Sequence, residues 1–256
     1  VEFSGVGLHS GETVQVRLLP AGPGTGIEFV RADLQDAPAI PANIAFQSHK
    51  DRRTRLVRGG AEVETVEHFL AVCAGMDVDN MRVELSGSEF PGLDGSAKPF
   101  IELIQQAGTV EQREPVKTFC LDQPIFVREG EATLVALPTD ADELTLQYVA
   151  SFDEPGVESG SFQISVNPDV FANEIAPART FCLASEVEAL QAAGLGKGAT
   201  RENTAPISGP RISPTPSRAS SRPSTGETIA QRVTSASARG PPTGPSANRT
   251  RKNSVN

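Results

Sequence analysis

Residues 64–70 read Glu64-Thr65-Val66-Glu67-His68-Phe69-Leu70, and they predict the start of a short amphipathic helix. Thr65 is a common N-cap residue type, and Gly75 is a common helix stop. The apolar side of this helix is expected at Val66, Phe69, Leu70 and Cys73. Glu67 and His68 are therefore expected side by side in the first turn, where the helix dipole favours a carboxylate.

The pair Glu67-His68 has the chemistry of a general base beside a metal ligand. A neutral imidazole binds zinc, and an adjacent carboxylate takes a proton from metal-bound water. The plainer alternative is a capping carboxylate beside a surface or half-buried histidine, which is the commoner situation for an isolated pair. The chain holds three histidines, and none follows His68. We predict His9 to be a hydrogen-bonded surface residue and His49 to be solvated in a charged loop.

Strands are predicted on both sides of this helix. Apolar residues alternate with polar ones, as in strands with one wet face, over 14–18, 27–29 and 81–85. A second helix should begin at a Ser96 cap, carry Pro99 in its first turn and end at Gly108.

The same pattern restarts later in the chain. Strands are predicted over 124–128, 132–137, 144–150 and 160–166. Ser185 and Glu188 then have the spacing of a capping box, which opens a helix that runs to Gly194. We therefore predict an α+β protein of two similar units. The predicted parts are a first domain over 1–112, an incomplete second domain over 113–204 and a tail over 205–256.

Charge separates the tail from the rest of the chain. Residues 1–200 hold 14 Lys and Arg against 30 Asp and Glu, whereas residues 205–256 hold 8 against 1. The tail also contains ten serines, eight prolines and no aromatic residue. Such a segment buries too little apolar surface to offset its ordering entropy, so we predict a disordered basic tail. It is either a basic arm for RNA or a membrane surface, or an out-of-frame reading of GC-rich coding sequence, and we favour the second.

Composition limits the remaining possibilities. No apolar run approaches the roughly 18 to 20 residues that a membrane span needs. The three cysteines are widely spaced and form no Cys-x-x-Cys pair, which indicates reduced thiols and a cytoplasmic protein.

The acidic part of the chain, residues 1–200, contains a basic cluster that consists of Arg52, Arg53, Arg55 and Arg58. It either faces the diphosphate of a nucleotide-sugar or lies in a solvated loop.

Several motifs together resemble one known family, the zinc-dependent UDP-3-O-acyl-N-acetylglucosamine deacetylases of lipid A biosynthesis (LpxC type). These motifs are Gly5-Val6-Gly7-Leu8-His9-Ser10-Gly11, Thr65-Val66-Glu67-His68, Asp79-Asn80-Met81-Arg82-Val83-Glu84, Phe90-Pro91-Gly92-Leu93-Asp94-Gly95-Ser96-Ala97-Lys98-Pro99-Phe100 and Ala178-Arg179-Thr180-Phe181. The resemblance covers residues 1 to about 204. Five motifs in the family's order are far more specific than any one of them.

The resemblance implies two similar α+β domains whose helical layers pack between the sheets, with the active site at their junction. It implies that Zn²⁺ is bound by His68 and that Glu67 is the general base. Thr180 matches the threonine that stabilises the oxyanion, and Phe181 matches an aromatic residue near the acyl-chain passage. The implied substrate is UDP-3-O-acyl-N-acetylglucosamine, whose N-acetyl group is released as acetate. No nucleic-acid partner is implied, and no oligomeric state is predicted.

The sequence also departs from the family's pattern. Relatives continue with a His-Lys-x-x-Asp-x-x-Gly-Asp helix, which completes the zinc site, and then a Gly-His pair. Neither is found here, and Cys182-Leu183 stands where Gly-Phe is common. With one zinc ligand of three, we expect a truncated or frame-shifted C-terminus and an inactive chain as written. The alternatives are a non-catalytic remnant or binding module with a basic arm, and a zinc amidase for another sugar.

Overall fold

The computed structural model describes residues 1–115, 120–141, 143–152, 157, 159–207, 232–239 and 252–255. Contacts between residues divide the chain into two compact units. The first unit comprises Val1–Lys117, Asn167–Pro206 and Ala247–Asn256, and the second comprises Thr118–Val166 and Ile207–Ser246. Both helices and strands are present, and the α+β class predicted from the sequence is confirmed.

A five-stranded sheet forms the base of the first unit, in the order β1-β2-β8-β3-β4. Its strands are β1 (Glu2–Val6), β2 (Thr13–Pro20), β3 (Ile27–Arg31), β4 (Ile40–Pro41) and β8 (Met81–Leu85). All neighbours are antiparallel except β3 and β8, which are parallel. The alternation read from the sequence is confirmed, because Val14, Val16 and Leu18 of β2 are all buried.

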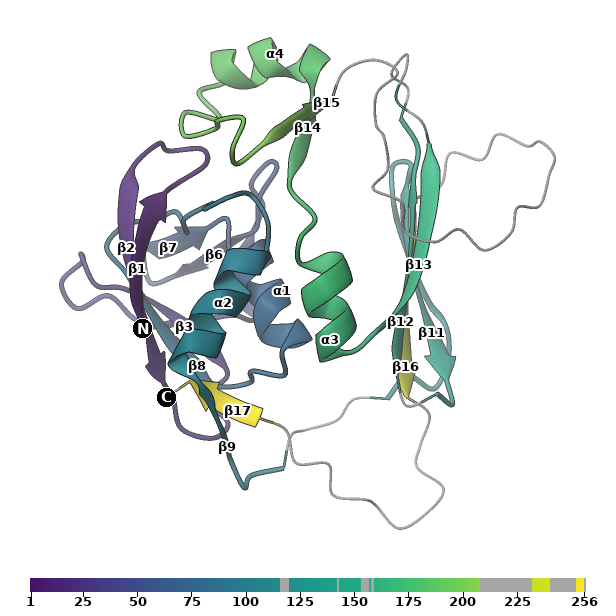
Figure 1. The fold of residues 1–256 in the computed structure, drawn as a ribbon, viewed down its shortest axis with the longest axis horizontal. Coiled ribbons are helices and arrows are strands. Elements are labelled where there is room, and N and C mark those ends of the chain that lie inside the picture. The colour runs from purple at the N-terminus through teal and green to yellow at the C-terminus, as the bar shows by residue number, and fades with distance from the viewer. Residues whose placement is uncertain are drawn as a thin grey trace. The chain divides into compact units, whose positions relative to one another are not determined.

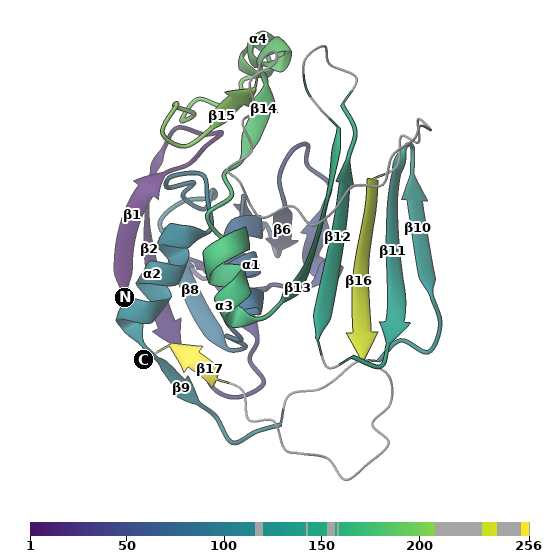
Figure 2. The same cartoon turned by 45° about the vertical axis from the view of Figure 1, so that its right-hand side comes forward.

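Two helices lie side by side on one face of this sheet, α1 (Glu67–Gly75) and α2 (Lys98–Ala107) (Figures 1 and 2). Between them and the sheet lies a cluster of five phenylalanines. Its members are Phe3, Phe29, Phe69, Phe90 and Phe100, with ring centroids 4.8 to 6.4 Å apart. Aromatic rings at these separations attract one another beyond the effect of burial alone. This cluster is the centre of the first unit's core.

A small three-stranded antiparallel sheet leads into α1. It consists of β5 (Gln47–Ser48), β6 (Arg55–Arg58) and β7 (Ala61–Glu64), and it follows the 3-10 helix η1 (Ile44–Phe46). β9 (Thr109–Glu111) follows α2 and pairs with β17 (Lys252–Val255). Because β7 ends one residue before Thr65, this sheet determines where the chain enters α1.

Residues 167–206 group with the first unit, although the sequence assigned them to a second domain. They form α3 (Pro168–Val170), the π-helical turn η2 (Phe171–Ile175), β14 (Phe181–Leu183), η3 (Ala184–Glu186), α4 (Val187–Ala192) and β15 (Ala205–Ile207). Three interactions with the earlier part of the unit explain this grouping. The Phe171 ring packs against Gly75, the Ala176 carbonyl accepts from the amides of Ala97 and Lys98, and the Thr180 amide donates to the Gly95 carbonyl at 2.7 Å.

The second unit is a single five-stranded sheet in the order β10-β11-β16-β12-β13. Its strands are β10 (Ile125–Glu129), β11 (Ala132–Thr139), β12 (Leu144–Ala150), β13 (Gly160–Val166) and β16 (Arg232–Arg239). The four strands predicted between 124 and 166 are confirmed within a few residues. Among the described residues of this unit there are strands and no helix, so its similarity to the first unit stays a prediction.

The tail predicted to be disordered contains strands where it is described. β16 pairs with β11 and β12, and β17 pairs with β9. The disorder of the tail as a whole stays a prediction. The prediction for 208–231, 240–251 and 256 falls outside the described residues.

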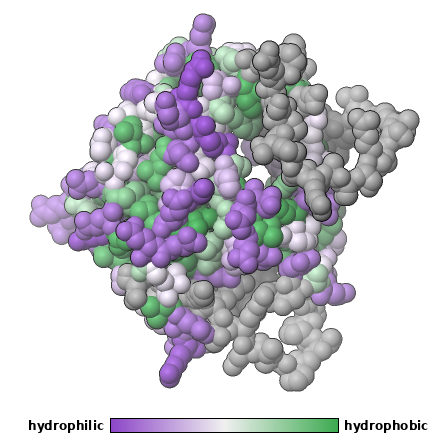
Figure 3. Space-filling model, in the orientation of Figure 1, coloured by the Kyte–Doolittle hydropathy of each residue, from purple (hydrophilic) through white to green (hydrophobic). Residues whose placement is uncertain are grey.

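On the visible face of the molecule, hydrophilic residues predominate and hydrophobic residues gather in smaller groups between them (Figure 3). This mixture is normal for a protein surface, which always keeps some apolar area. None of the described helices is long and apolar enough to cross a membrane.

Candidate active site

A cavity of about 240 Å³ lies within the first unit. Its polar lining includes His9, Arg52, Thr65, Glu67, His68, Thr180, Asn203 and Thr204. Its apolar lining includes Leu8, Phe181, Leu190 and Leu195. All four site residues predicted from the sequence therefore border one cavity, although Glu67 and Thr180 are more than one hundred residues apart in the chain. Every lining residue belongs to the first unit, so the segments that the sequence placed in two domains form one site.

The first turn of α1 brings Glu67 and His68 to the cavity. Glu67 is the first residue of the helix, and its Oε2 accepts a hydrogen bond from the Thr54 amide at 3.1 Å. The Thr54 carbonyl in turn accepts from the Thr65 amide at 2.9 Å. The Glu67 carboxylate is thus held at the edge of the cavity by a neighbouring loop, and it retains one oxygen for other contacts.

The predicted Thr65 cap is wrong. The N-cap of α1 is Val66, which makes no side-chain capping hydrogen bond. Thr65 has a φ of +60°, and its hydroxyl donates to Glu89 Oε1 at 3.0 Å. A β-branched residue rarely adopts positive φ, so the surrounding contacts must maintain this conformation. The sequence predicted the helix correctly, because the spacing of its apolar residues is a local property. It did not predict the partner of the Thr65 hydroxyl, because the contact with Glu89 is a tertiary one.

The second helix differs from its prediction by one position at its start. α2 begins at Lys98 with Ala97 as its N-cap, and Ser96 Oγ accepts from the Lys98 amide at 3.2 Å. Pro99 lies in the first turn, and Gly108 is the C-cap, as predicted. Later in the chain the Leu183 amide donates to the Glu186 carboxylate at 3.2 Å, and Glu186 is the N-cap of α4.

His9 lies in the cavity wall rather than on the surface, contrary to the sequence-based expectation. Its amide donates to Glu89 Oε1, and its buried Nδ1 has no hydrogen-bond partner among the described residues. Burial lowers the pKa of His9 below 6.5, and Arg53 lowers the pKa further, against the opposing effect of nearby glutamates. Burial therefore favours the neutral imidazole.

Thr180 and Phe181 also line the cavity. The Thr180 amide donates to the Gly95 carbonyl, and its carbonyl accepts from the Ala205 amide at 3.1 Å. Gly95 has a φ of +80°, and an added Cβ would lie only 1.9 Å from the Asn203 carbonyl oxygen. Only glycine permits this approach, which brings Gly95, the partner of the Thr180 amide, close to the backbone of Asn203.

The basic cluster is neutralised by partners within the protein. Arg52 pairs with Glu186 at 2.6 Å, Arg53 pairs with Glu64 at 2.6 Å, and Arg55 pairs with Glu62. Arg58 donates to the Ala39 carbonyl and lies over the Phe46 ring. Arg52 is the one member that lines the cavity. The cluster is thus mainly structural, and His49 stays in an exposed loop beside Asp51, as predicted.

The site includes residues that sequence reasoning missed. Glu89 and Asn203 are buried polar residues that hold the cavity walls, and Cys182 lines the cavity. Nothing in the local sequence indicates that the Glu89 carboxylate is buried or that Thr65 has a positive φ. The one sequence feature that marked this part of the site was the glycine-rich loop near the start of the chain.

The described residues do not fit a catalytic zinc. Such sites use three protein ligands. No group of three or more His, Cys, Asp or Glu side chains lies close enough to hold a metal ion within the described part of the chain. His9, His68, Glu67 and Cys182 line the cavity, but they do not form such a group.

Acid should destabilise the first unit through two buried carboxylates. Burial raises the pKa of Glu64, but hydrogen bonds from Lys50 and Arg53 outweigh it, and the net pKa lies below 4.5. The pKa of Glu89 is lowered below 4.5 in the same way, by donors at His9, Ser10 and Thr65. A lowered folded pKa gives stability that is present above the unfolded value and is lost as the pH falls through the folded value. The free energy of unfolding should therefore decrease from about pH 6 to about pH 3.

Urea titrations across this pH range measure the effect, with Glu64→Gln as the test variant. The variant should show a flatter pH dependence than the unmodified chain, because one carboxylate no longer takes up a proton. An identical slope in both proteins would contradict the assignment.

Comparison with known proteins connects this site to a family. The family described as "LpxC: UDP-3-O-acyl N-acetylglycosamine deacetylase" matches residues 1–219. A UDP-3-O-acyl-N-acetylglucosamine deacetylase of Anaeromyxobacter sp. (strain Fw109-5) is 43% identical over 203 residues, which cover 79% of this chain and 66% of that protein. The deacetylase of Nostoc sp. (strain PCC 7120) is 44% identical, with coverages of 82% and 76%.

A third deacetylase, from Thermosynechococcus vestitus, is 44% identical over 79% of this chain and 70% of its own length. The chain therefore spans about two thirds to three quarters of these relatives. The family match covers the five motifs and every residue that lines the cavity. This chain belongs to the family of UDP-3-O-acyl-N-acetylglucosamine deacetylases of lipid A biosynthesis.

Proposed function

We propose that this chain carries part of the active site for hydrolysis of the N-acetyl group of UDP-3-O-acyl-N-acetylglucosamine. In this reaction water adds to the amide carbonyl, the C–N bond breaks, and acetate and a free amine are released. The observation that supports the proposal is the convergence of Glu67, His68 and Thr180 on one cavity. The names of the relatives support the same substrate.

Glu67 is the proposed general base. A base must lie within hydrogen-bond reach of the attacking water, and Glu67 is at the cavity edge with its Oε2 held by Thr54. Because the Thr54 amide holds Oε2, the orientation of the Glu67 carboxylate is restricted, and its other oxygen is the one proposed to accept the proton. The proton then passes to the departing amine, which leaves neutral.

Thr180 is the proposed donor to the oxyanion that forms when water adds to the carbonyl. Pre-positioned donors of this kind commonly contribute 10² to 10³ in rate. The Thr180 backbone is held on both sides, by Gly95 and by Ala205. Phe181, with Leu190 and Leu195, gives the same cavity an apolar wall, which we propose lies along the acyl chain.

Zinc is the metal expected for this family. We propose His68 as one of its ligands, and the described residues supply no complete set of three. Water without a metal is a weak nucleophile at neutral pH. We therefore expect this chain alone to lack turnover. We place the reaction in the cytoplasm, since Cys73, Cys120 and Cys182 are free thiols.

Purified chain should bind less than one zinc per molecule at micromolar metal and release no acetate from the substrate. The reason is the incomplete ligand set. Metal analysis by mass spectrometry and an acetate-release assay measure both quantities, with the Anaeromyxobacter relative as the positive control. One tightly bound zinc per chain together with turnover would contradict this expectation and would require ligands from a second subunit.

A second function, a binding module for the nucleotide-sugar, is supported by a specific feature. The cavity keeps its polar and apolar walls even though the metal ligands are incomplete. Isothermal titration of the substrate into the metal-free chain tests this function. Saturable binding would support the binding module, and the absence of binding would contradict it.

A further inference from the structure

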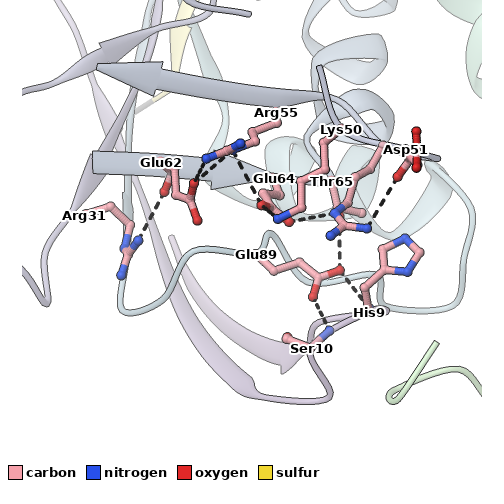
Figure 4. Close-up of polar contacts among 11 residues, drawn as sticks. His9, Ser10, Arg31, Lys50, Asp51, Arg55, Glu62, Glu64, Thr65 and Glu89 are labelled. Carbon is pink, nitrogen blue, oxygen red and sulfur yellow. Dashed lines mark hydrogen bonds and ion pairs between the residues drawn. The ribbon is translucent and has the colours of Figure 1, made fainter. Parts of the chain in front are cut away.

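Glu89 is a buried carboxylate between β8 and α2, and only 3% of its surface is exposed. It accepts three hydrogen bonds from two distant parts of the chain (Figure 4). Oε1 accepts from the His9 amide at 2.8 Å and from the Thr65 hydroxyl at 3.0 Å. Oε2 accepts from the Ser10 amide at 2.7 Å. A carboxylate in this setting is retained only because its donors replace the water it has lost.

The loop before Ser10 is shaped to admit this carboxylate. A Cβ added at Gly7 would lie 2.5 Å from Glu89 Oε2 and 2.4 Å from Ser10 Oγ. Any side chain at position 7 would therefore displace the carboxylate or the loop. Two backbone contacts support the same junction: the Phe90 amide donates to the Glu64 carbonyl at 2.9 Å, and Gly7 forms an isolated bridge with Pro91.

One end of this junction is the entrance to α1. Thr65 has a φ of +60°, and the next residue, Val66, is an N-cap without a capping side chain. The hydrogen bond to Glu89 helps to hold this backbone conformation, which a β-branched residue rarely adopts. Since Glu67 begins the helix, the direction of its first turn depends on where Thr65 is held.

The other end of the junction is the cavity wall. Leu8 and His9 both line the cavity, and the backbone of His9 is bound to the same oxygen of Glu89 as the Thr65 hydroxyl. A single carboxylate oxygen thus connects the wall that carries His9 with the helix that carries Glu67.

We propose that Glu89 is a positioning residue for the active site, which sets the place of the first turn of α1 against the loop 7–10. The inference rests on the proposed function only in taking Glu67 and His68 as the reacting pair. It goes beyond that function because Glu89 itself does not line the cavity and contacts no reacting group.

Glu89→Gln tests the proposal in the full chain, since it keeps the shape and removes one acceptor. An amide has a single oxygen, so an NH₂ group must face either the Ser10 amide or the donors at His9 and Thr65. Hydrogen–deuterium exchange should become about tenfold faster at the amides of 8–10 and 65–69, the change expected when one hydrogen bond to a charged group is lost. Exchange in β2 and β8 should stay unchanged.

The matched control is Glu62→Gln. Glu62 lies on β7, three residues before Thr65, and pairs with Arg55 at a partly exposed position. The control removes the same charge from the same region, and it should leave exchange at 8–10 and 65–69 unchanged. If Glu89→Gln accelerates exchange uniformly across the first unit, Glu89 is merely a structural residue and the proposal is overturned.

Two further variants keep the test decisive if Glu89→Gln does not fold. Thr65→Val keeps the β-branched shape and removes only the hydroxyl, so exchange at 65–69 should rise. Thr65→Ser restores the donor, so exchange should return to the original rate. Equal exchange in the valine and serine variants would overturn the proposal. None of these measurements needs turnover, so a failure of the proposed deacetylation would be seen separately, in the acetate-release assay.

Discussion

Glu67→Ala should lower kcat by about 10² to 10⁴ in a form of this protein that turns over, because it removes the proposed general base. A suitable form is a chimera in which residues 1–204 are continued by the C-terminal part of the Anaeromyxobacter relative, which is 43% identical over the matched region. The zinc content of the chimera should not change. The cavity should keep its shape, since Glu67 contacts the surrounding loop through one hydrogen bond, from the Thr54 amide.

His68→Ala in the same chimera should behave differently, with loss of both zinc and activity, because a ligand and a base have separate roles. Glu62→Ala is the matched control, since Glu62 is a carboxylate of β7 that does not line the cavity. It should retain near-normal turnover and zinc. Near-normal turnover in Glu67→Ala would show that the base has been wrongly assigned.

Phe90→Ala should lower the free energy of unfolding of the first unit by about 3 to 5 kcal/mol, the usual cost of removing a buried aromatic ring. Phe90 is fully buried, and its ring lies 4.8 Å from that of Phe69 and 5.5 Å from that of Phe100. The rings of Phe3 and Phe29 lie 6.1 and 6.2 Å away. Truncation removes a central member of the cluster, so several neighbours lose packing partners together.

Urea unfolding followed by hydrogen exchange in β2 and β8 measures this effect on the first unit alone. Phe126→Ala in the second unit is the control, because 69% of the Phe126 surface is exposed, and it should cost well under about 1 kcal/mol. A loss below about 1 kcal/mol in Phe90→Ala would show that the cluster collapses around the gap and is not a tightly packed core.

Local periodicity was enough to predict much of the fold. The alternation at Val14, Val16 and Leu18 predicted β2, and the helical spacing from Phe69 to Cys73 predicted α1. These patterns work because a side chain's burial in a strand or helix repeats with the geometry of that element. The hairpin of β6 and β7 was not predicted, since its charged residues, such as Arg55 and Glu62, pair with each other across the strands and hide the alternation.

The candidate site, like the fold, could be predicted from the sequence only in part. Glu67 and His68 are neighbours in the chain, so a helix start places both together, and the family motifs added Thr180 and Phe181. Their convergence on one cavity came from tertiary contacts, such as the hydrogen bond between the Thr180 amide and the Gly95 carbonyl. Glu89 shows the limit most clearly. Its donors His9 and Thr65 lie 80 and 24 residues away, and hydrogen bonds over such separations depend on the folded path of the chain, which no local pattern records.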